Sequence, residues 1–284
     1  MKTKIFVCSN SGIDYIKHST NIDTIPIIYT FNNGEEYIDY INLTADAFYN
    51  RKKYDNLISV DYTSVEYSFV NEKVKKAITE GYKQILFLLS SKHYSNLFVT
   101  ASIVLSENKN IKSSIYDSNL FSYPLAYMAM KANEMFEKGL SMDEVLAKLD
   151  IFKKNQNIFI FEPKLKDEYS NVFEKNFRSG KCYSILNGRV VKMNVPVKDS
   201  LVKVFADYSR QIDGLDIIPF VLTTDLNSRY VSILTNGILD IDPTKSSNPN
   251  YKKIPVCFIP PTVGMELGNN LVGIGYIIDD DSLI

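Results

Sequence analysis

The chain has 284 residues, 45% of them hydrophobic and 23% charged, with a formal net charge of -1, which suits one or two globular domains and gives no reason to expect nucleic acid as a partner. Its three cysteines lie far apart and it has only two histidines, so a disulfide framework and the usual zinc patterns are excluded. We find no apolar run long enough for a signal peptide or a membrane span, and we therefore expect a cytoplasmic protein without membrane insertion.

The first predicted strand is short, residues 4–8, and a turn of small polar residues, Ser9–Gly12, follows it. A β-hairpin is predicted at about residues 25–41, because Asn33-Gly34 is a strong signal for a tight turn. Pro26 near its start predicts a strand at the edge of a sheet. Thr44 is expected to cap a short helix that ends near residue 51.

Helices and strands alternate in the next part of the chain. A helix is predicted after Thr63-Ser64 and ends near Gly81, and residues 84–89 form an apolar strand of the kind buried in a parallel sheet. A helix at 97–106 and a strand at 111–116 follow. Two further helices come next, and Ser141 with Glu144 forms a capping box at the start of the second. This alternation predicts a largely parallel, doubly wound sheet.

The second half has more strands. We predict strands at 157–162, 217–224, 256–259 and 271–278, a hairpin from 182 to 195 around Asn187-Gly188, and helices at 226–236 and from Asp199 or Ser200 to about 212. The predicted fold class is therefore α/β with two domains. Residues 1–155 carry the parallel sheet and the inserted hairpin, and residues 156–284 carry a mixed sheet.

Polar loops follow several of these strands. The loop Ser90–Asn96 comes directly after the apolar strand, where ligands bind in open α/β sheets, and its end opens a helix. Thr63-Ser64, at a predicted junction between a loop and a helix, offers hydroxyls that suit a carboxylate. The alternatives are an ordinary polar loop in the first case and simple helix capping in the second. His93 is expected to be a solvated loop histidine.

Several short segments of the first domain occur in a familiar order. An Asp-Ser-Thr-Ala-Asp-like loop appears as Ser9–Asp14, and an Asp-Gly-Glu-Ser-Tyr-Arg-Asp-like hairpin appears as Asn33–Asp39. A Ser-Ser-Gly-Leu-Ser-Gly-Thr-like loop appears as Ser90–Asn96, and an Ile-Asp-Ser-like strand end as Tyr116–Ser118. In order and spacing the first domain resembles the DegV family, whereas the second domain resembles it much less.

This resemblance implies a non-catalytic protein without a cofactor, whose ligand is a long-chain fatty acid. It implies that the acyl chain lies in an apolar tunnel at a cleft between the two domains, and that the carboxylate meets hydroxyl groups of the matching loops. Some members of the family present the fatty acid to a separate kinase subunit. The predicted ligand-binding residues are Ser9, Ser11, Thr63, Ser64, Ser91, Ser95, Asn96, Asp117, Ser118, Gly264 and Glu266.

The chain departs from the family pattern at two places. The segment Gly264–Gly268 matches a loop of the family and is expected to be a loop here. Glu266 stands in it where the family has a histidine, and an ionised glutamate would repel a carboxylate. Glu266 therefore points away, or holds a proton, or the ligand is not a simple fatty acid. The family's Gly-Gly-Arg segment is replaced by residues 164–168, which puts the partnership with a fatty acid kinase in question.

Two other functions stay open on the sequence alone. One is a module that kept the fold and lost its ligand, and the other is a small serine hydrolase that uses the region of Ser90–Ser95. The Gly273-Ile274-Gly275 motif lies in a predicted strand and lacks the third glycine of a dinucleotide site. Asp279–Asp281 is interpreted as an acidic tail or a weak cation site.

Overall fold

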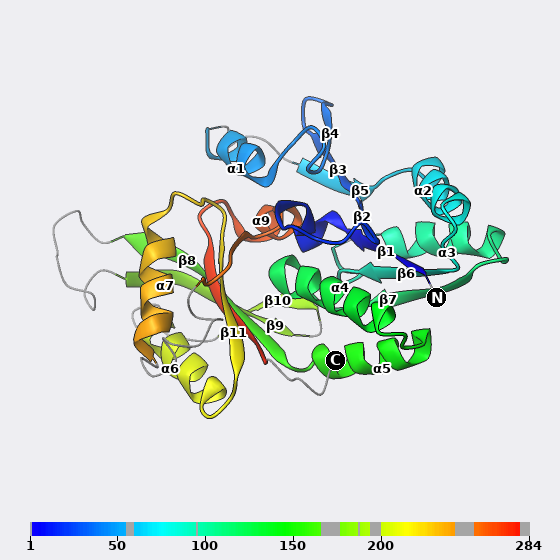
Figure 1. The fold of residues 1–284 in the computed structure, drawn as a ribbon. Helices are drawn as coiled ribbons and strands as arrows, with labels where there is room; N and C mark the ends of the chain where they lie inside the picture. Colours follow the sequence, from blue (N-terminus) through cyan, green and yellow to red (C-terminus); the bar gives the residue numbers. More distant parts are fainter. Residues whose placement is uncertain are drawn as a thin grey trace. The chain divides into compact units, whose positions relative to one another are not determined.

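The computed structural model describes residues 2–54, 60–94, 96–165, 177–186, 188–193, 200–241 and 253–278. The chain forms two compact units (Figure 1). The first comprises the chain up to Lys154 together with Pro260–Thr262, and the second comprises Asn155–Ile259 and Val263–Asp280. The three residues Pro260–Thr262 thus pack with a unit from which they are distant in sequence.

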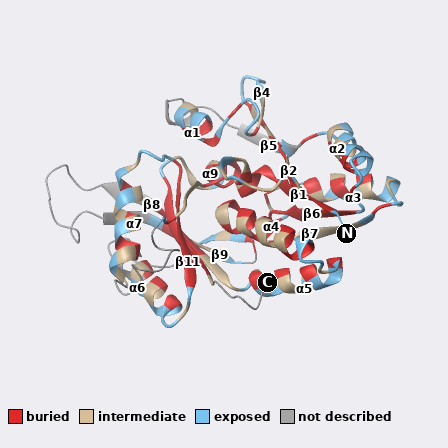
Figure 2. Ribbon diagram, in the orientation of Figure 1, coloured by how far each residue is buried: buried red, intermediate tan, exposed pale blue. Residues whose placement is uncertain are grey.

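A parallel sheet of four strands forms the centre of the first unit. Its order is β2 (Ile22–Ile25), β1 (Thr3–Cys8), β6 (Gln84–Leu89) and β7 (Lys112–Asp117). The two central strands are buried along their whole length, and most of their side chains are apolar on both faces of the sheet (Figure 2). The predicted parallel sheet is confirmed.

Four helices cover this sheet. Helices α2 (Tyr67–Thr79) and α3 (Leu97–Glu107) pack on each other, and α4 (Ser122–Glu137) packs with α5 (Met142–Phe152). Figure 1 shows the first pair on one face of the sheet and the second pair on the other. The predicted capping box at the start of α5 is confirmed, since Ser141 and Glu144 hydrogen-bond each other's backbone amides.

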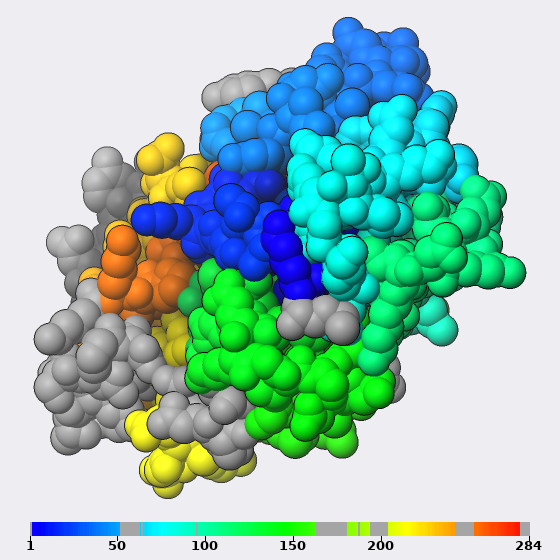
Figure 3. Space-filling model, turned by 45° about the vertical axis from the view of Figure 1, so that its right-hand side comes forward, coloured from blue at the N-terminus to red at the C-terminus, as the bar shows by residue number. Residues whose placement is uncertain are grey.

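The first unit also contains a small antiparallel sheet, with the order β4 (Glu36–Ile38), β3 (Ile27–Phe31) and β5 (Val60–Ser64). Helix α1 (Ala45–Tyr54) lies between β4 and β5 in the chain. The predicted hairpin is confirmed for β3 and β4, and its exposed tip stands out at the top of Figure 3. Thr44 caps α1 as expected, accepting from the amide of Ala47.

Two predictions in this region are wrong. Ile25 was assigned to the hairpin, but it ends the separate strand β2, which pairs with β1. Thr63-Ser64 was placed just before a helix, but the pair ends strand β5, and α2 begins only at Tyr67. Pairing with a distant strand decides both cases, and local pattern gives no sign of that pairing.

The second unit is built on a sheet of six strands. Their order is β10 (Arg189–Lys192), β9 (Phe177–Leu186), β8 (Gln156–Leu165), β13 (Val272–Ile278), β11 (Ile217–Thr223) and β12 (Val256–Phe258). Only β11 and β12 pair in parallel, so the predicted mixed sheet is confirmed. The predicted second hairpin strand is shorter than expected, and Val195 and the candidate cap Asp199 lie outside the described residues.

Helices α6 (Ser200–Ile212) and α7 (Arg229–Ile241) cover one face of this sheet (Figure 1). Their apolar stripes bury Val204, Tyr208 and Leu234 in a core with strand residues such as Val221 and Ile274. The segment around Gly264 was predicted to be a loop, but it forms helix α9 (Pro261–Leu267). Pro261 favours a helix start, because its φ angle already suits the first turn and the amide hydrogen it lacks would have no partner there.

Within the described ranges, every helix is too short or too polar to span a bilayer.

Candidate functional site

Polar residues gather where the parallel strands of the first unit end. The short 3-10 turn Ser9–Ser11 follows β1, Ser90 and Ser91 follow β6, and Ser118 follows β7. Because parallel strands end on the same side of a sheet, these residues share its carboxyl edge. Gly12 closes the first turn with a φ of 64°, in the left-handed region that glycine adopts without strain.

Asn10 is the centre of a buried polar network at this edge. Its side-chain amide donates to Ser90 Oγ at 3.2 Å and to the carbonyl oxygen of Tyr94 at 3.4 Å. Its Oδ1 accepts from the hydroxyl of Thr262 at 2.9 Å. Asn10 and Ser90 are fully buried, so these bonds tie three separate parts of the chain together in a region without solvent competition.

The other serines of the edge hold the local backbone. Ser9 Oγ accepts from the amide of Ile27 at 3.1 Å, and Ser118 Oγ donates to the carbonyl oxygen of Leu89 at 2.7 Å. Ser11 and Ser91 each accept from the amide two residues further on. All four are buried. Their hydroxyls therefore shape the turns. For Ser91 this agrees with the ordinary polar loop that the sequence leaves open as the alternative.

Asp117 also has local partners. One of its carboxylate oxygens accepts from the amide of Asn119 at 3.1 Å, and its carbonyl oxygen accepts from Lys153 Nζ at 2.7 Å. The ammonium group of Lys153 thus lies beside the end of β7. It brings a positive charge to this part of the first unit.

Thr63 and Asn96 are different, because both are exposed. Asn96 Nδ2 donates to Thr63 Oγ1 at 3.3 Å, so the predicted loop after β6 and the end of β5 meet. The end of β5 also lies near Ser9, since Ser64 pairs in register with Ile27, whose amide donates to Ser9. Asn96 directly precedes α3, whose N-terminus carries a partial positive charge. This corner can therefore accept an anionic group.

The remaining predicted residues are not joined to this group. The side chain of Ser64 and all of Ser95 lie outside the described parts of the chain. Gly264 and Glu266 lie on α9 in the second unit, where Glu266 is exposed. The pKa of Tyr183 is raised by burial, and the charges of Glu162 and Glu266 raise it further. A role for Gly264 and Glu266 in ligand binding, like the cleft between the domains, stays a prediction.

Three residues of this region were missing from the sequence prediction. Asn10 lies in the predicted turn, but only its neighbours Ser9 and Ser11 were among the predicted ligand-binding residues. Thr262 is contributed by a distant stretch of sequence and gives no local signal. Asp39 ends the hairpin segment of the family-like pattern, and in the structure its buried carboxyl group accepts a hydrogen bond from Tyr29 Oη at 3.2 Å.

No group of three or more His, Cys, Asp or Glu side chains in the described parts of the chain is arranged to hold a metal ion.

Comparisons with known proteins agree on one family. The family model described as "Uncharacterised protein, DegV family" matches residues 2–166. A DegV domain-containing protein of Clostridium perfringens is 24% identical over 288 residues, covering 95% of this chain and 97% of the relative.

Two solved structures have the same fold. A fatty acid binding DegV family protein from Streptococcus agalactiae has a TM-score of 0.75 at 15% identity, covering 99% of this chain and 100% of that one. The Streptococcus pneumoniae fatty acid kinase B3 protein loaded with linoleic acid has a TM-score of 0.66 at 14% identity, covering 98% and 100%.

Proposed function

The chain belongs to the DegV family, and from this premise we propose that it binds a long-chain fatty acid whose carboxylate docks at the carboxyl edge of the parallel sheet in the first unit. The observation that carries the proposal is the exposed pair Thr63 and Asn96 beside the start of α3. Thr63 Oγ1 accepts from Asn96, so its own proton can be donated to a ligand oxygen. A helix N-terminus adds a partial positive charge that favours a carboxylate.

The buried network beneath this pair supports the same proposal. Asn10 links the turn after β1 to the loop after β6 through its bond to Ser90. Residues that recognise a ligand bind more tightly when other bonds already hold them in place, because less conformational entropy is lost on binding. The network is thus suited to hold the corner at Thr63 and Asn96 in a binding geometry.

A carrier fits these residues better than the serine hydrolase left open by the sequence. Ser90 and Ser91 are buried, and the oxygen of each already accepts a hydrogen bond, from Asn10 and from the amide of His93 respectively. A nucleophilic serine needs a side-chain base that takes its proton and a free approach for the substrate. We therefore propose that the protein binds its ligand without converting it.

The proposal extends to a protein partner and to the location of the protein in the cell. The likeness to the Streptococcus pneumoniae fatty acid kinase B3 protein suggests a kinase subunit that phosphorylates the bound carboxylate. Such a partner would use ATP, and on this ground we propose a cytoplasmic location for the protein. Incubating the loaded protein with a fatty acid kinase and ATP tests this part, with formation of an acyl phosphate as the expected result.

Thr63→Val removes the hydroxyl proton that is proposed to reach the ligand and keeps the shape of the side chain. We expect binding of a fluorescent long-chain fatty acid to weaken by about 1 kcal/mol, and by more if the head group is ionised. Thr79→Val is the matched control, because Thr79 is exposed on α2 and its hydroxyl bonds only the carbonyl oxygen of Lys75 within the same helix.

Extraction and native mass spectrometry of the purified protein give the direct test, with a co-purified long-chain acid as the expected result. An empty protein that also fails to bind the fluorescent acid would contradict the proposal and favour the module without a ligand. Glu266→Gln belongs in the same titration. Tighter binding at neutral pH would place the Glu266 charge near the head group, and unchanged binding would remove Glu266 from the site.

A further inference from the structure

We propose that a pocket of the first unit, lined by Asp14 and Asp39, binds an alkylammonium group, which is a protonated primary amine on a short apolar chain. Such a ligand lies outside the proposed function, because a fatty acid carries the opposite charge. It gives a role to two carboxyl groups that the proposed fatty-acid site does not use.

The pocket has a volume of about 180 Å³, well above the ~10–15 Å³ that one water molecule needs. It lies among the 3-10 turn Ile13–Tyr15, strand β2, the loop after β4 and helix α2. Its lining includes the charged residues Asp14, Asp23, Asp39 and Lys73 and the apolar residues Ile41 and Phe69. The pocket can therefore hold a ligand with one charged end and one apolar end.

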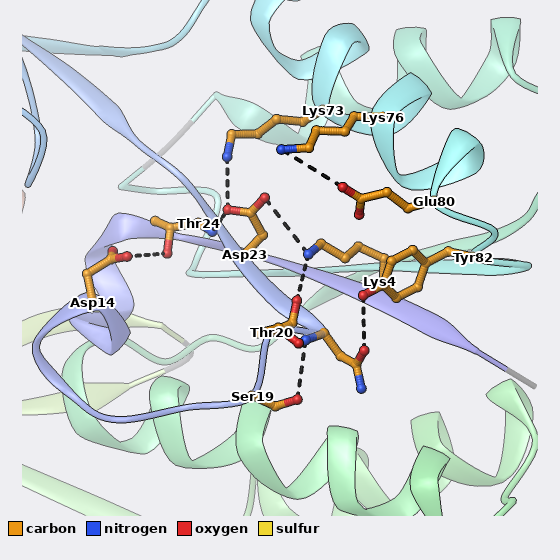
Figure 4. A network of polar contacts seen from close by, with 11 residues as sticks. Lys4, Asp14, Ser19, Thr20, Asp23, Thr24, Lys73, Lys76, Glu80 and Tyr82 are labelled. Carbon is orange, nitrogen blue, oxygen red and sulfur yellow. Dashed lines mark hydrogen bonds and ion pairs between the residues drawn. The ribbon is translucent and has the colours of Figure 1, made fainter.

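The ammonium groups beside the pocket are already engaged with Asp23. Lys73 Nζ lies 2.9 Å from one oxygen of Asp23, and Lys4 Nζ lies 4.0 Å from the other (Figure 4). In the described parts of the chain, Asp14 and Asp39 form no ion pair. Two negative charges of the pocket are thus left for a cation that enters it.

Asp39 is the more deeply placed of these two carboxylates. It lines the pocket although it is only 5% exposed, and its Oδ2 accepts from Tyr29 Oη at 3.2 Å. An ionised carboxylate has about four sites that accept hydrogen bonds, so Asp39 has capacity for a further donor. A buried charge without a cation is unfavourable, and contact with an ammonium group would remove that cost.

The pKa values of both carboxyl groups agree with this charge balance. Burial raises the pKa of Asp39 to about 6, and the charge of Asp14 raises it further. Burial also raises the pKa of Asp14, although Thr24, through a hydrogen bond, and the charge of His18 act in the opposite direction. An ammonium group in the pocket would stabilise both charged forms.

The walls of the pocket favour an alkylammonium group over a metal ion. The ring of Phe69 already faces an ammonium group, since Lys73 Nζ lies 5.5 Å from its centroid, and Tyr40 adds a second ring to the lining. Ile41 is 62% exposed and would be covered by the alkyl chain. The described residues offer no group of three metal-ligating side chains.

The rim of the pocket is fixed by local hydrogen bonds. Tyr40 has a φ of 65°, in the left-handed region that a bulky residue rarely adopts. Its amide donates to the carbonyl oxygen of Leu43 at 2.9 Å, and Asn42 Oδ1 accepts from the amide of Ile38 at 2.6 Å. Because these bonds hold the loop, little conformational entropy is lost when a ligand enters.

The first experiment titrates the full chain with n-butylammonium chloride and follows its amide signals by NMR. At pH 8 the carboxyl groups are ionised and a primary amine is protonated. We expect saturable shifts at Thr24, Tyr40 and Ile41, and much smaller shifts with n-butanol or with sodium chloride at the same concentration. Equal shifts with all three compounds, or shifts that do not saturate, would overturn the proposal.

Removal of either charge should weaken the binding of n-butylammonium by about tenfold, the usual effect of losing one charge-assisted hydrogen bond. The variants are Asp39→Asn and Asp14→Asn, and asparagine keeps an oxygen that can accept from Tyr29 or from Thr24. Asp14 is half-buried, so its variant still tests the site if Asp39→Asn fails to fold. Parent-like binding by the folded variants would overturn the proposal.

Asp46→Asn is the matched control for these two variants. Asp46 is an exposed carboxylate on α1 that bonds the side chain of Asn50 and does not line the pocket. It should bind n-butylammonium like the parent. An equal loss in this variant would mean that the protein's overall charge, and not the pocket, attracts the amine.

Lys73→Gln gives a test of opposite sign. It removes the ammonium group that competes with the ligand and releases the carboxylate of Asp23. Binding of n-butylammonium should therefore tighten by about threefold, whereas general damage to the pocket would weaken it. Unchanged or weaker binding would overturn the role of charge in this pocket.

A second probe distinguishes the two sources of an alkylammonium group. Nα-acetyl-lysine N-methylamide carries the same butylammonium chain as part of a peptide unit. Tighter binding of this compound than of n-butylammonium would assign the pocket to a lysine side chain of a partner protein, and weaker binding would assign it to a free amine. If neither compound binds, the proposal is wrong.

Discussion

At the scale of single residues, burial separates the hydroxyls that shape the site from those that can meet a ligand. Ser118 is fully buried, and its Oγ both donates to Leu89 and accepts from Leu120. Thr63 and Asn96 are exposed at the same corner of the first unit. A substitution at Ser118 should therefore act mainly on stability, whereas a substitution at Thr63 should act on binding.

Gly275 shows how closely two strands of the second unit approach each other. It lies in β13, paired with Phe220 on β11 and Ile158 on β8. A Cβ atom at Gly275 would lie 2.6 Å from the carbonyl oxygen of Asn157 and would overlap the ring of Phe220. The Gly-Ile-Gly motif thus serves packing, in agreement with the sequence interpretation that it is not a dinucleotide site.

Gly275→Ala should destabilise the protein by about 1–3 kcal/mol, the usual cost of forcing an extra carbon into a packed core. Urea unfolding followed by circular dichroism measures this. Adding Phe220→Leu should restore only part of the stability, because the carbonyl oxygen of Asn157 belongs to the backbone and cannot move aside.

Gly237→Ala is a suitable comparison for this prediction. Its Cβ would meet only the ring of Phe205, at 2.9 Å, which is half-buried and can turn away. Alanine also favours the helix α7 by about 1 kcal/mol over glycine. A loss of stability at Gly237 as large as that at Gly275 would contradict this explanation.

At the scale of elements, the start of α5 is determined by local sequence. Ser141 accepts from the amide of Glu144, and Glu144 accepts from the amide and the hydroxyl of Ser141. These bonds hold the pKa of Glu144 below its ordinary value. Because all the partners lie within one helical turn, the pattern could be found in the sequence.

Ser141→Ala should lower the free energy of unfolding by about 1 kcal/mol, since it leaves one helix amide without its cap. Ser106→Ala is the control, because Ser106 is exposed at the end of α3 and bonds only the carbonyl oxygen of Ile103 in its own helix. Thermal unfolding of both variants beside the parent gives the comparison. Equal effects would mean that the cap contributes nothing specific.

Strand β5 is the opposite case. Its residues Val60–Ser64 become a strand because they pair with β3, which lies about thirty residues earlier in the chain. The segment Pro261–Leu267, where a loop was predicted, also forms a different element, helix α9. The family pattern predicts a loop there, whereas Pro261 is a local signal for the start of a helix.

At the scale of the whole molecule, the first unit depends on a contact between two distant parts of the sequence. Thr262 donates to Asn10 Oδ1 although 252 positions separate the two residues. Tyr49 Oη donates to the carbonyl oxygen of Pro260 in the same stretch. The buried network around Asn10 is therefore complete only when Pro260–Thr262 is in place.

Thr262→Val should leave a buried amide oxygen without its partner and destabilise the protein by about 1–3 kcal/mol. Thr262→Ser keeps the hydroxyl and should lose much less. Chemical denaturation of the two variants measures the difference. If valine and serine had the same effect at this position, the hydrogen bond to Asn10 would have no part in stability.

The sequence by itself determined the alternation of helices and strands, the parallel and mixed sheets, the hairpins and the family. These features depend on periodicity, turn residues and caps, which act over a few residues and leave a visible pattern. Tertiary structure alone decided that most of the predicted serines are buried, that Thr63 meets Asn96, and that Thr262 joins the network around Asn10. Such contacts depend on which distant segments pack together, and no local pattern of residues records that.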